Sequence, residues 1–163
     1  MRKKLIILLF WVVVSTLLIQ FVWKSSDEEF VTYIANPKKE TLRFYYKDDK
    51  QINFQNLNNL KQWLNVKNKE LVFAMNGGMY KKDKSPQGLY IENEIIKAPL
   101  DTAAGEGNFY LKPNGVFYLT TKNEAKVAIT ETFINNKNVK FATQSGPMLV
   151  SGGKIQKAFN ATS

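Results

Sequence analysis

An apolar run that ends abruptly in glycine constrains the fold of this chain more than any other feature. Residues 73–75 are apolar, and Asn76-Gly77-Gly78 follows them directly. Because glycine has no Cβ, such a junction brings bare backbone to a loop at the end of a strand, which is the geometry of a ligand site. A second junction of this kind is Gln144-Ser145-Gly146-Pro147, again after a strand-like run. We expect the two strand ends to face one cleft.

The N-terminal 24 residues predict a membrane segment. Basic residues at positions 2–4 precede residues 5–23, which are apolar except for Ser15, Thr16 and Gln20. A helix of that length spans about 28 Å, enough for the hydrocarbon core of a bilayer. The basic flank places the N-terminus in the cytoplasm, and a cleaved signal peptide is the alternative. We expect an anchor or signal segment at 1–24, a tether at 25–29, and one domain at 30–163 on the outer, periplasmic or extracellular side.

Composition excludes several classes of chemistry. The chain has no histidine and no cysteine, which removes Ser-His-Asp triads, histidine-bound zinc, disulfides and thiol nucleophiles. The net charge is +9, but Arg2 and Arg43 are the only arginines, so dense clamping of nucleic-acid phosphates is not supported. We expect no cofactor, no metal ion and no nucleic-acid partner, so carboxylates, lysines, tyrosines and backbone amides must do any catalysis.

Turn residues and hydrophobic periodicity predict a fold rich in strands. Leu57, Leu60 and Leu64 recur at helical spacing, which predicts one amphipathic helix at 56–65. Strands are expected at 30–35, 41–47, 70–75 and 139–145. Hairpins are expected where 88–92 meets 95–97, where 108–112 meets 116–120, and where 148–151 meets 154–156. The expected fold class is α+β: a β-rich mixed sheet or sheets with hairpins and one or two helices, preceded by a transmembrane helix.

Five short motifs occur in an order that resembles one known family. They are Asn76-Gly77-Gly78-Met79-Tyr80, Pro86-Gln87-Gly88-Leu89-Tyr90, Gly107-Asn108-Phe109-Tyr110, Pro113-Asn114-Gly115-Val116-Phe117 and Gln144-Ser145-Gly146-Pro147-Met148-Leu149. Each is weak alone, but together, across residues 71–163, they resemble the phosphodiester glycosidase family. The resemblance implies hydrolysis of a sugar-1-phosphodiester to a free sugar and a phosphomonoester, with an envelope location in bacteria. Family domains extend beyond the position of Ser163, so we expect this domain to be incomplete at its C-terminus.

The motifs supply candidate substrate-binding residues. Backbone amides of Gly77-Gly78 and Ser145-Gly146 are expected to donate to phosphate oxygens, and the side chains of Asn76 and Gln144 to bond sugar hydroxyls. Tyr80, which closes the first motif, belongs to the same expected set. The alternative for both glycine-bearing segments is a tight turn that binds no ligand.

Two carboxylates are the candidates for catalysis. Asp101 and Glu106 flank the small-residue loop 102–105. Glycoside hydrolysis needs a carboxylate as base or nucleophile, whereas a phosphomonoester, with a second pKa of about 6, leaves with little need of a strong acid. The alternative is that both are solvated loop acids. Lysines 81, 82 and 84 either attract an anionic diester or form a solvated face.

Two functions are compatible with these features. The first is a membrane-anchored hydrolase, attached through residues 5–23, that cleaves sugar-1-phosphodiesters on envelope or exopolysaccharide glycans. The second is a non-catalytic envelope module that binds glycan or phosphate in the same cleft. Release of sugar from a sugar-1-phosphodiester distinguishes the first function from the second.

Overall fold

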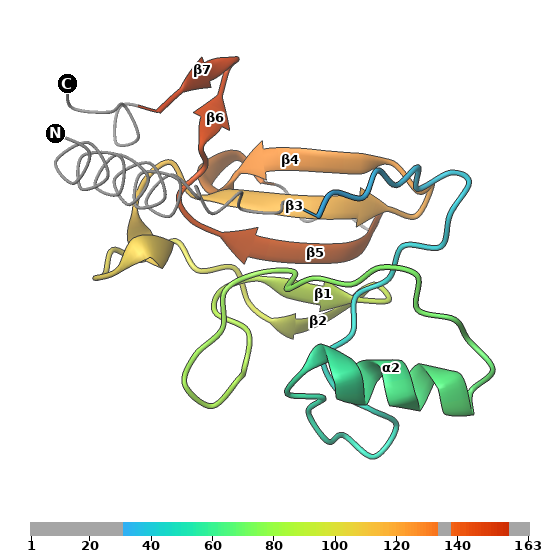
Figure 1. The fold of residues 1–163 in the computed structure, drawn as a ribbon. Coiled ribbons are helices and arrows are strands. Elements are labelled where there is room, and N and C mark those ends of the chain that lie inside the picture. Colours follow the sequence, from blue (N-terminus) through green and yellow to red (C-terminus); the bar gives the residue numbers. More distant parts are fainter. Residues whose placement is uncertain (1–30, 134–137, 157–163) are drawn as a thin grey trace, which may run out of the picture. The chain divides into compact units, whose positions relative to one another are not determined.

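The computed structural model describes residues 31–133 and 138–156 (Figure 1). The chain divides into two units, Met1–Tyr33 and Ile34–Ser163, and nearly all described residues belong to the second. The segments predicted as membrane anchor (1–24) and tether (25–29) lie outside the described residues. Within the described ranges, no helix has the length and apolar character needed to cross a bilayer.

The second unit is built on a five-stranded sheet. In chain order its strands are β1 (Tyr90–Glu92), β2 (Ile95–Ala98), β3 (Gly115–Thr120), β4 (Ala125–Ile129) and β5 (Val139–Ser145), and their order across the sheet is β2-β1-β5-β3-β4. Every pair of neighbouring strands is antiparallel. The β-rich fold is therefore confirmed, but the prediction of a mixed sheet is wrong, because β5 enters between two hairpins and runs antiparallel to both.

Two predicted hairpins are present. The β1–β2 turn has positive φ at both central residues, 50° at Asn93 and 67° at Glu94, which is the turn geometry that matches the twist of paired strands. A second, two-stranded sheet joins β6 (Val150–Ser151) to β7 (Lys154–Ile155) through Gly152-Gly153, again with positive φ at both residues. The short-range turn chemistry of the sequence was sufficient to predict both.

The predicted hairpin between 108–112 and 116–120 is wrong. Residues Asn108–Tyr110 form a short 3-10 helix, η1, and the hairpin partner of β3 is β4, which the hydrophobic pattern did not reveal. A second 3-10 helix, η2 (Thr130–Thr132), follows β4. Asn114, which that hairpin would place in its turn, is instead buried and uses its side chain inside the protein.

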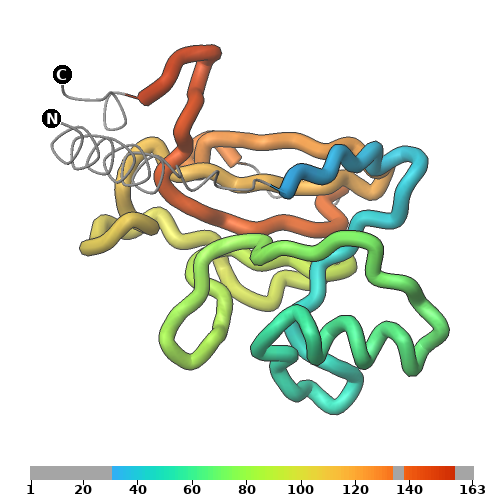
Figure 2. Tube along the Cα trace, viewed as in Figure 1, coloured from blue at the N-terminus to red at the C-terminus, as the bar shows by residue number. Residues whose placement is uncertain are grey.

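Two predicted strands, 41–47 and 70–75, are extended segments outside both sheets (Figure 2). The first is held by its aromatic residues, since the Phe44 ring lies 5.4 to 6.2 Å from the rings of Phe141, Phe117 and Tyr90. In the second, the apolar side chains face solvent, since Val72 is 70% exposed and Met75 is 71% exposed. An apolar run predicted a strand here, yet no neighbouring strand pairs with it in the described part of the chain. The strand predicted at 30–35 is likewise absent from residues 31–35.

The predicted helix is confirmed as α2 (Leu57–Val66). Its N-cap is Asn56, whose side-chain oxygen accepts a hydrogen bond from the backbone N–H of Asn59 at 2.9 Å. Leu60 and Leu64 are buried, and the Trp63 ring meets Tyr45 and Phe54 edge to face. The helix is therefore stabilised by its cap and by one apolar face.

The core lies largely against one face of the sheet. It contains Leu89, Ile91, Val116, Phe133, Val139 and Ala142. Because side chains alternate along a strand, Thr143 and Gln144 at the end of β5 point to opposite faces. This strand end is where the family motifs meet.

Candidate functional site

The first glycine corner lies directly against β5. A Cβ placed on Gly78 would lie 2.1 Å from Thr143 Oγ1 and 3.3 Å from the carbonyl oxygen of Gln144. Only glycine allows so close an approach. The corner at residues 76–78 therefore adjoins the strand end that carries Ser145-Gly146, although a cleft between the two corners stays a prediction.

The side chain of Gln144 points to the other face and is 1% exposed. Its Oε1 accepts hydrogen bonds from the backbone N–H groups of Leu89 at 2.9 Å and Asp101 at 3.0 Å. Its Nε2 donates to the carbonyl oxygen of Asp101 at 2.6 Å and to Asn114 Oδ1 at 2.9 Å. The Gln144 amide, which was predicted to bond a sugar hydroxyl, thus makes its hydrogen bonds to protein groups. Gln144 therefore links the segments around the end of β5 to one another.

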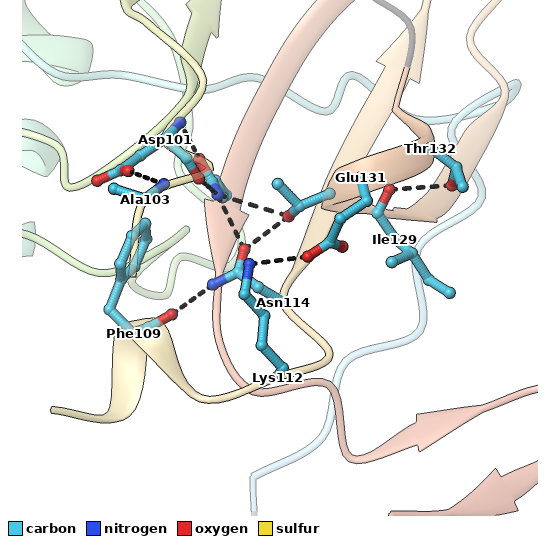
Figure 3. Close-up of polar contacts among 10 residues, drawn as sticks. Asp101, Ala103, Phe109, Lys112, Asn114, Ile129, Glu131 and Thr132 are labelled. Atoms are coloured by element: carbon cyan, nitrogen blue, oxygen red, sulfur yellow. Dashed lines mark hydrogen bonds and ion pairs between the residues drawn. The ribbon is translucent and has the colours of Figure 1, made fainter. Parts of the chain in front are cut away.

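Asn114 continues this network (Figure 3). It is 2% exposed, its Nδ2 donates to the carbonyl oxygen of Phe109, and its Oδ1 also accepts the Thr130 hydroxyl at 2.7 Å. Sequence reasoning assigned Asn114 no role beyond a turn. Its local sequence, Pro-Asn-Gly, carries no signal of burial, because the partners lie 16 and 30 residues away along the chain.

Two further motif glycines enclose the same amides. Gly88 has φ +74°, and a Cβ there would lie 2.4 Å from Gln144 Oε1. A Cβ on Gly146 would lie 2.3 Å from the Phe109 carbonyl oxygen and 2.5 Å from Asn114 Nδ2. All five motifs therefore converge on the end of β5, through Gly78, Gly88, Phe109, Asn114 and Gln144 itself.

Asp101 is hydrogen-bonded to Gln144 at the end of β5, whereas Glu106 is not. Asp101 is half-buried, its Oδ1 accepts from the Ala103 backbone N–H at 2.9 Å, and its Oδ2 accepts from the Tyr110 hydroxyl at 3.3 Å. Gly105 lies on the Tyr110 ring, where a Cβ would come within 2.6 Å. Glu106 is exposed and makes no hydrogen bond or ion pair to the described residues. Of these two candidates, Asp101 is therefore the one whose carboxylate is fixed by contacts with the described residues.

The remaining predicted binding residues are open to solvent. Asn76, Gly77 and Ser145 are exposed, and a Cβ on Gly77 would meet no heavy atom within 4 Å. Tyr80 is 50% exposed, with Lys84 Nζ 4.8 Å from the centre of its ring. These residues have the free surface that a ligand needs.

One titratable pair at the sheet was missed by sequence reasoning. The Tyr90 hydroxyl donates to Glu92 Oε2 at 3.2 Å, and Tyr90 pairs with Thr143 across β1 and β5. Burial raises the pKa of the Glu92 carboxyl, against the lowering effects of the Tyr90 hydroxyl and of Lys97. Burial is also the main cause that raises the pKa of the Tyr90 hydroxyl, and the nearby charge of Glu92 raises it further. The sequence shows only a short hairpin here and gives no signal of the pair.

A metal centre finds no support in residues 31–133 and 138–156, which contain no group of three or more potential ligands. The expectation of a protein without metal or cofactor stays a prediction. Neutral amides, backbone N–H groups and one held carboxylate are the chemistry available at this strand end. Such groups can bind phosphate and sugar oxygens and can supply a base or a nucleophile.

Comparison with known proteins agrees with the convergence of the motifs. The phosphodiester glycosidase family model matches residues 69–163, more than half of the chain, so this chain belongs to the phosphodiester glycosidase family. It is also similar to the uncharacterized protein YigE of Escherichia coli (strain K12), with 38% identity over 123 residues. That match covers 76% of this chain and 48% of YigE, so the chain spans about half the length of this relative. No solved structure matches.

Proposed function

We propose that this chain is a hydrolase that cleaves sugar-1-phosphodiesters on envelope or exopolysaccharide glycans. The products are a free sugar and a phosphomonoester. Membership of the phosphodiester glycosidase family supports the reaction class. The observation that carries the proposal is the convergence of all five motifs at the end of β5, which leaves Asn76, Gly77 and Ser145 open to solvent.

The substrate's phosphate and sugar make different demands on the site. The phosphate needs donors, a role we give to the backbone of Gly77-Gly78 and of Ser145-Gly146, of which Gly77 and Ser145 are exposed. The sugar hydroxyls need polar side chains, a role we give to Asn76 and to the half-exposed Tyr80 of the same motif. Gln144 contributes by supporting the site, because its amide is already bonded within the protein.

The reaction also needs a carboxylate. Asp101 takes this role in the proposal, because it is half-buried, hydrogen-bonded and attached to the same strand end through Gln144. Glu106, on the adjoining loop, is the second candidate. The leaving phosphomonoester has a second pKa of about 6, so a protein without histidine needs no strong general acid to expel it.

Asn76→Ala tests the proposal in the full-length protein held in detergent. The probe is a set of sugar 1-(methyl phosphate) diesters that includes N-acetylglucosamine, and the measurement is release of free sugar. We expect the wild-type chain to release sugar and Asn76→Ala to reduce kcat/KM more than tenfold, a loss of about 1.4 kcal/mol in transition-state stabilisation. Thermal unfolding should not change, because the Asn76 side chain is exposed.

The matched control is Asn58→Ala, at an exposed asparagine on α2. It should leave kcat/KM unchanged. Equal losses in the two variants would contradict the role of Asn76. Binding of a diester without release of sugar would favour the alternative function, a non-catalytic glycan- or phosphate-binding envelope module.

We further propose that residues 5–23 anchor the protein in the cytoplasmic membrane, with the N-terminus inside and the domain outside. The nineteen-residue apolar stretch behind three basic residues supports this placement. Alkaline extraction of membranes should leave the chain in the pellet, and mass spectrometry should recover its N-terminal peptide. A mature N-terminus beyond Lys24 would show cleavage and exclude the anchor.

A further inference from the structure

We propose that Gln144 is a positioning residue for Asp101: its buried amide fixes the main chain of Asp101 and so sets where the carboxylate stands at the end of β5. This inference rests on the proposed function, in which Asp101 is the reacting carboxylate. It assigns a role to a residue that sequence reasoning had placed against the substrate.

The contact between the two residues is bidentate. Gln144 Oε1 accepts from the Asp101 backbone N–H at 3.0 Å, while Gln144 Nε2 donates to the Asp101 carbonyl oxygen at 2.6 Å. The side chain therefore pairs with both polar groups of one main-chain residue, as a neighbouring strand would. Asp101 lies 43 residues away in sequence and just beyond the end of β2, where no strand partner holds it.

The same amide ties a second segment to this point. Gln144 Oε1 also accepts from the Leu89 backbone N–H at 2.9 Å, and the Gln144 backbone N–H donates to the Leu89 carbonyl oxygen at 2.9 Å. Leu89 before β1, Asp101 just beyond β2 and the end of β5 are therefore all held by one side chain. A displacement of the Gln144 side chain would therefore break the hydrogen bonds that hold the main chain of Asp101.

The orientation of the amide is determined by its surroundings. Its oxygen faces two N–H donors and its nitrogen faces the oxygens of Asp101 and Asn114, so a flipped amide would lose all four hydrogen bonds. Asn114 is fixed in turn, because its oxygen accepts the Thr130 hydroxyl and its nitrogen donates to the Phe109 carbonyl. These contacts run from Phe109 through Asn114 and Gln144 to Asp101, and Figure 3 shows Phe109, Asn114 and Asp101 along this path.

The carboxylate itself receives two further restraints. The Ala103 backbone N–H donates to Oδ1, and the Tyr110 hydroxyl donates to Oδ2, with the Tyr110 ring covered by Gly105. Each carboxylate oxygen can accept a second hydrogen bond, and the residue remains half-exposed. Asp101 is thus held in one place with acceptor capacity free for a water or a substrate hydroxyl.

Gln144→Glu and Gln144→Met test the role in the full-length protein. Glutamate keeps the shape and the acceptor but removes the donor to Asp101, and methionine removes both. With the N-acetylglucosamine methyl phosphodiester, we expect each variant to lower kcat at least thirtyfold and to change KM less than threefold. A change of kcat and KM by similar factors would show that Gln144 affects substrate binding, and would overturn the positioning role.

Backbone amide hydrogen exchange gives a readout that needs no turnover. In Gln144→Met the amides of Asp101 and Leu89 should exchange at least tenfold faster, while that of Val116 in β3 should not change. Unchanged exchange at Asp101 would overturn the inference. Accelerated exchange in Gln144→Met, together with a wild-type protein that hydrolyses no diester, would instead reject the proposed function, and with it the catalytic purpose of the contact.

Two variants separate positioning from stability. Tyr110→Phe keeps the ring beneath Gly105 and removes only the hydroxyl on Asp101 Oδ2, so it should fold and lower kcat about fivefold with KM unchanged. Leu64→Ala removes a buried side chain of α2 and should lower the melting temperature while leaving kcat unchanged. A loss of kcat in Leu64→Ala equal to that in the Gln144 variants would assign the whole effect to stability.

Discussion

Two regions at the end of β5 differ sharply although residues of the family motifs contribute to both. The first is the amide cluster of Gln144, Asn114 and Thr130, in which every side-chain polar atom is buried and bonded within the protein. The second is the open corner of Asn76 and Gly77, which is exposed and has free space above the glycine. The comparison shows that motif residues divide into those that build the support and those that remain free to meet a ligand.

The difference follows from the energetics of buried polar groups. A buried amide without a partner costs about 1–3 kcal/mol, so a buried cluster persists only when all its members are bonded. The described part of the chain contains no buried side-chain nitrogen or oxygen without a partner. Such a cluster specifies one geometry, whereas exposed groups such as the Asn76 side chain exchange water for ligand at little cost.

The largest expected effect comes from filling the space beside the amide cluster. In Gly88→Ala the new Cβ would lie 2.4 Å from Gln144 Oε1 and 2.6 Å from the Phe109 ring, on a backbone with φ +74°. Overpacking together with left-handed strain should lower the free energy of unfolding by about 3 kcal/mol. Urea unfolding of the full-length protein, followed by tryptophan fluorescence, measures the loss.

The open corner supplies the matched control. Gly77 has free space at the Cβ position and is not among the glycines with positive φ. Gly77→Ala should therefore change the free energy of unfolding by no more than about 0.5 kcal/mol. Similar losses in the two variants would mean that the two regions do not differ in packing as described.

A smaller effect is expected from Glu92, whose carboxyl group the sheet partly buries. Its pKa is raised above the ordinary 4.5 by burial, so ionisation of Glu92 favours the unfolded state. Its contribution to stability is complete below the ordinary value and is lost as the pH rises through the raised value. Glu92→Gln keeps an acceptor for the Tyr90 hydroxyl but carries no charge, so it should avoid this loss.

The measurement is the difference in free energy of unfolding between Glu92→Gln and wild type across the acidic range. The difference should move in favour of the variant as the pH rises from below 4.5 toward neutrality, and should remain smaller than the effect of Gly88→Ala because Glu92 is only half-buried. The opposite trend would mean that the attraction of Lys97 outweighs burial. The open corner of Asn76 and Gly77 contains no titratable side chain, so substitutions there should not show this dependence on pH.

The site could be predicted from the sequence in part. The motifs identified the family, and the first motif does lie against the end of β5, at Gly78. The sequence did not reveal that Gln144 and Asn114 form a buried cluster, because burial depends on partners 30 and 43 residues away. It also assigned strands to 41–47 and 70–75, where apolar character was present but no neighbouring strand supplied a ladder.

The sequence by itself determined the features that depend on a few adjacent residues: the helix α2, the β1–β2 turn at Asn93-Glu94, and the strand β5. These follow from backbone preference and local hydrogen bonds. Only the tertiary structure decided which motif residues support the site and which stay open. That decision depends on the placement of β5 between two hairpins, which brings distant segments together and buries one amide while leaving another in water.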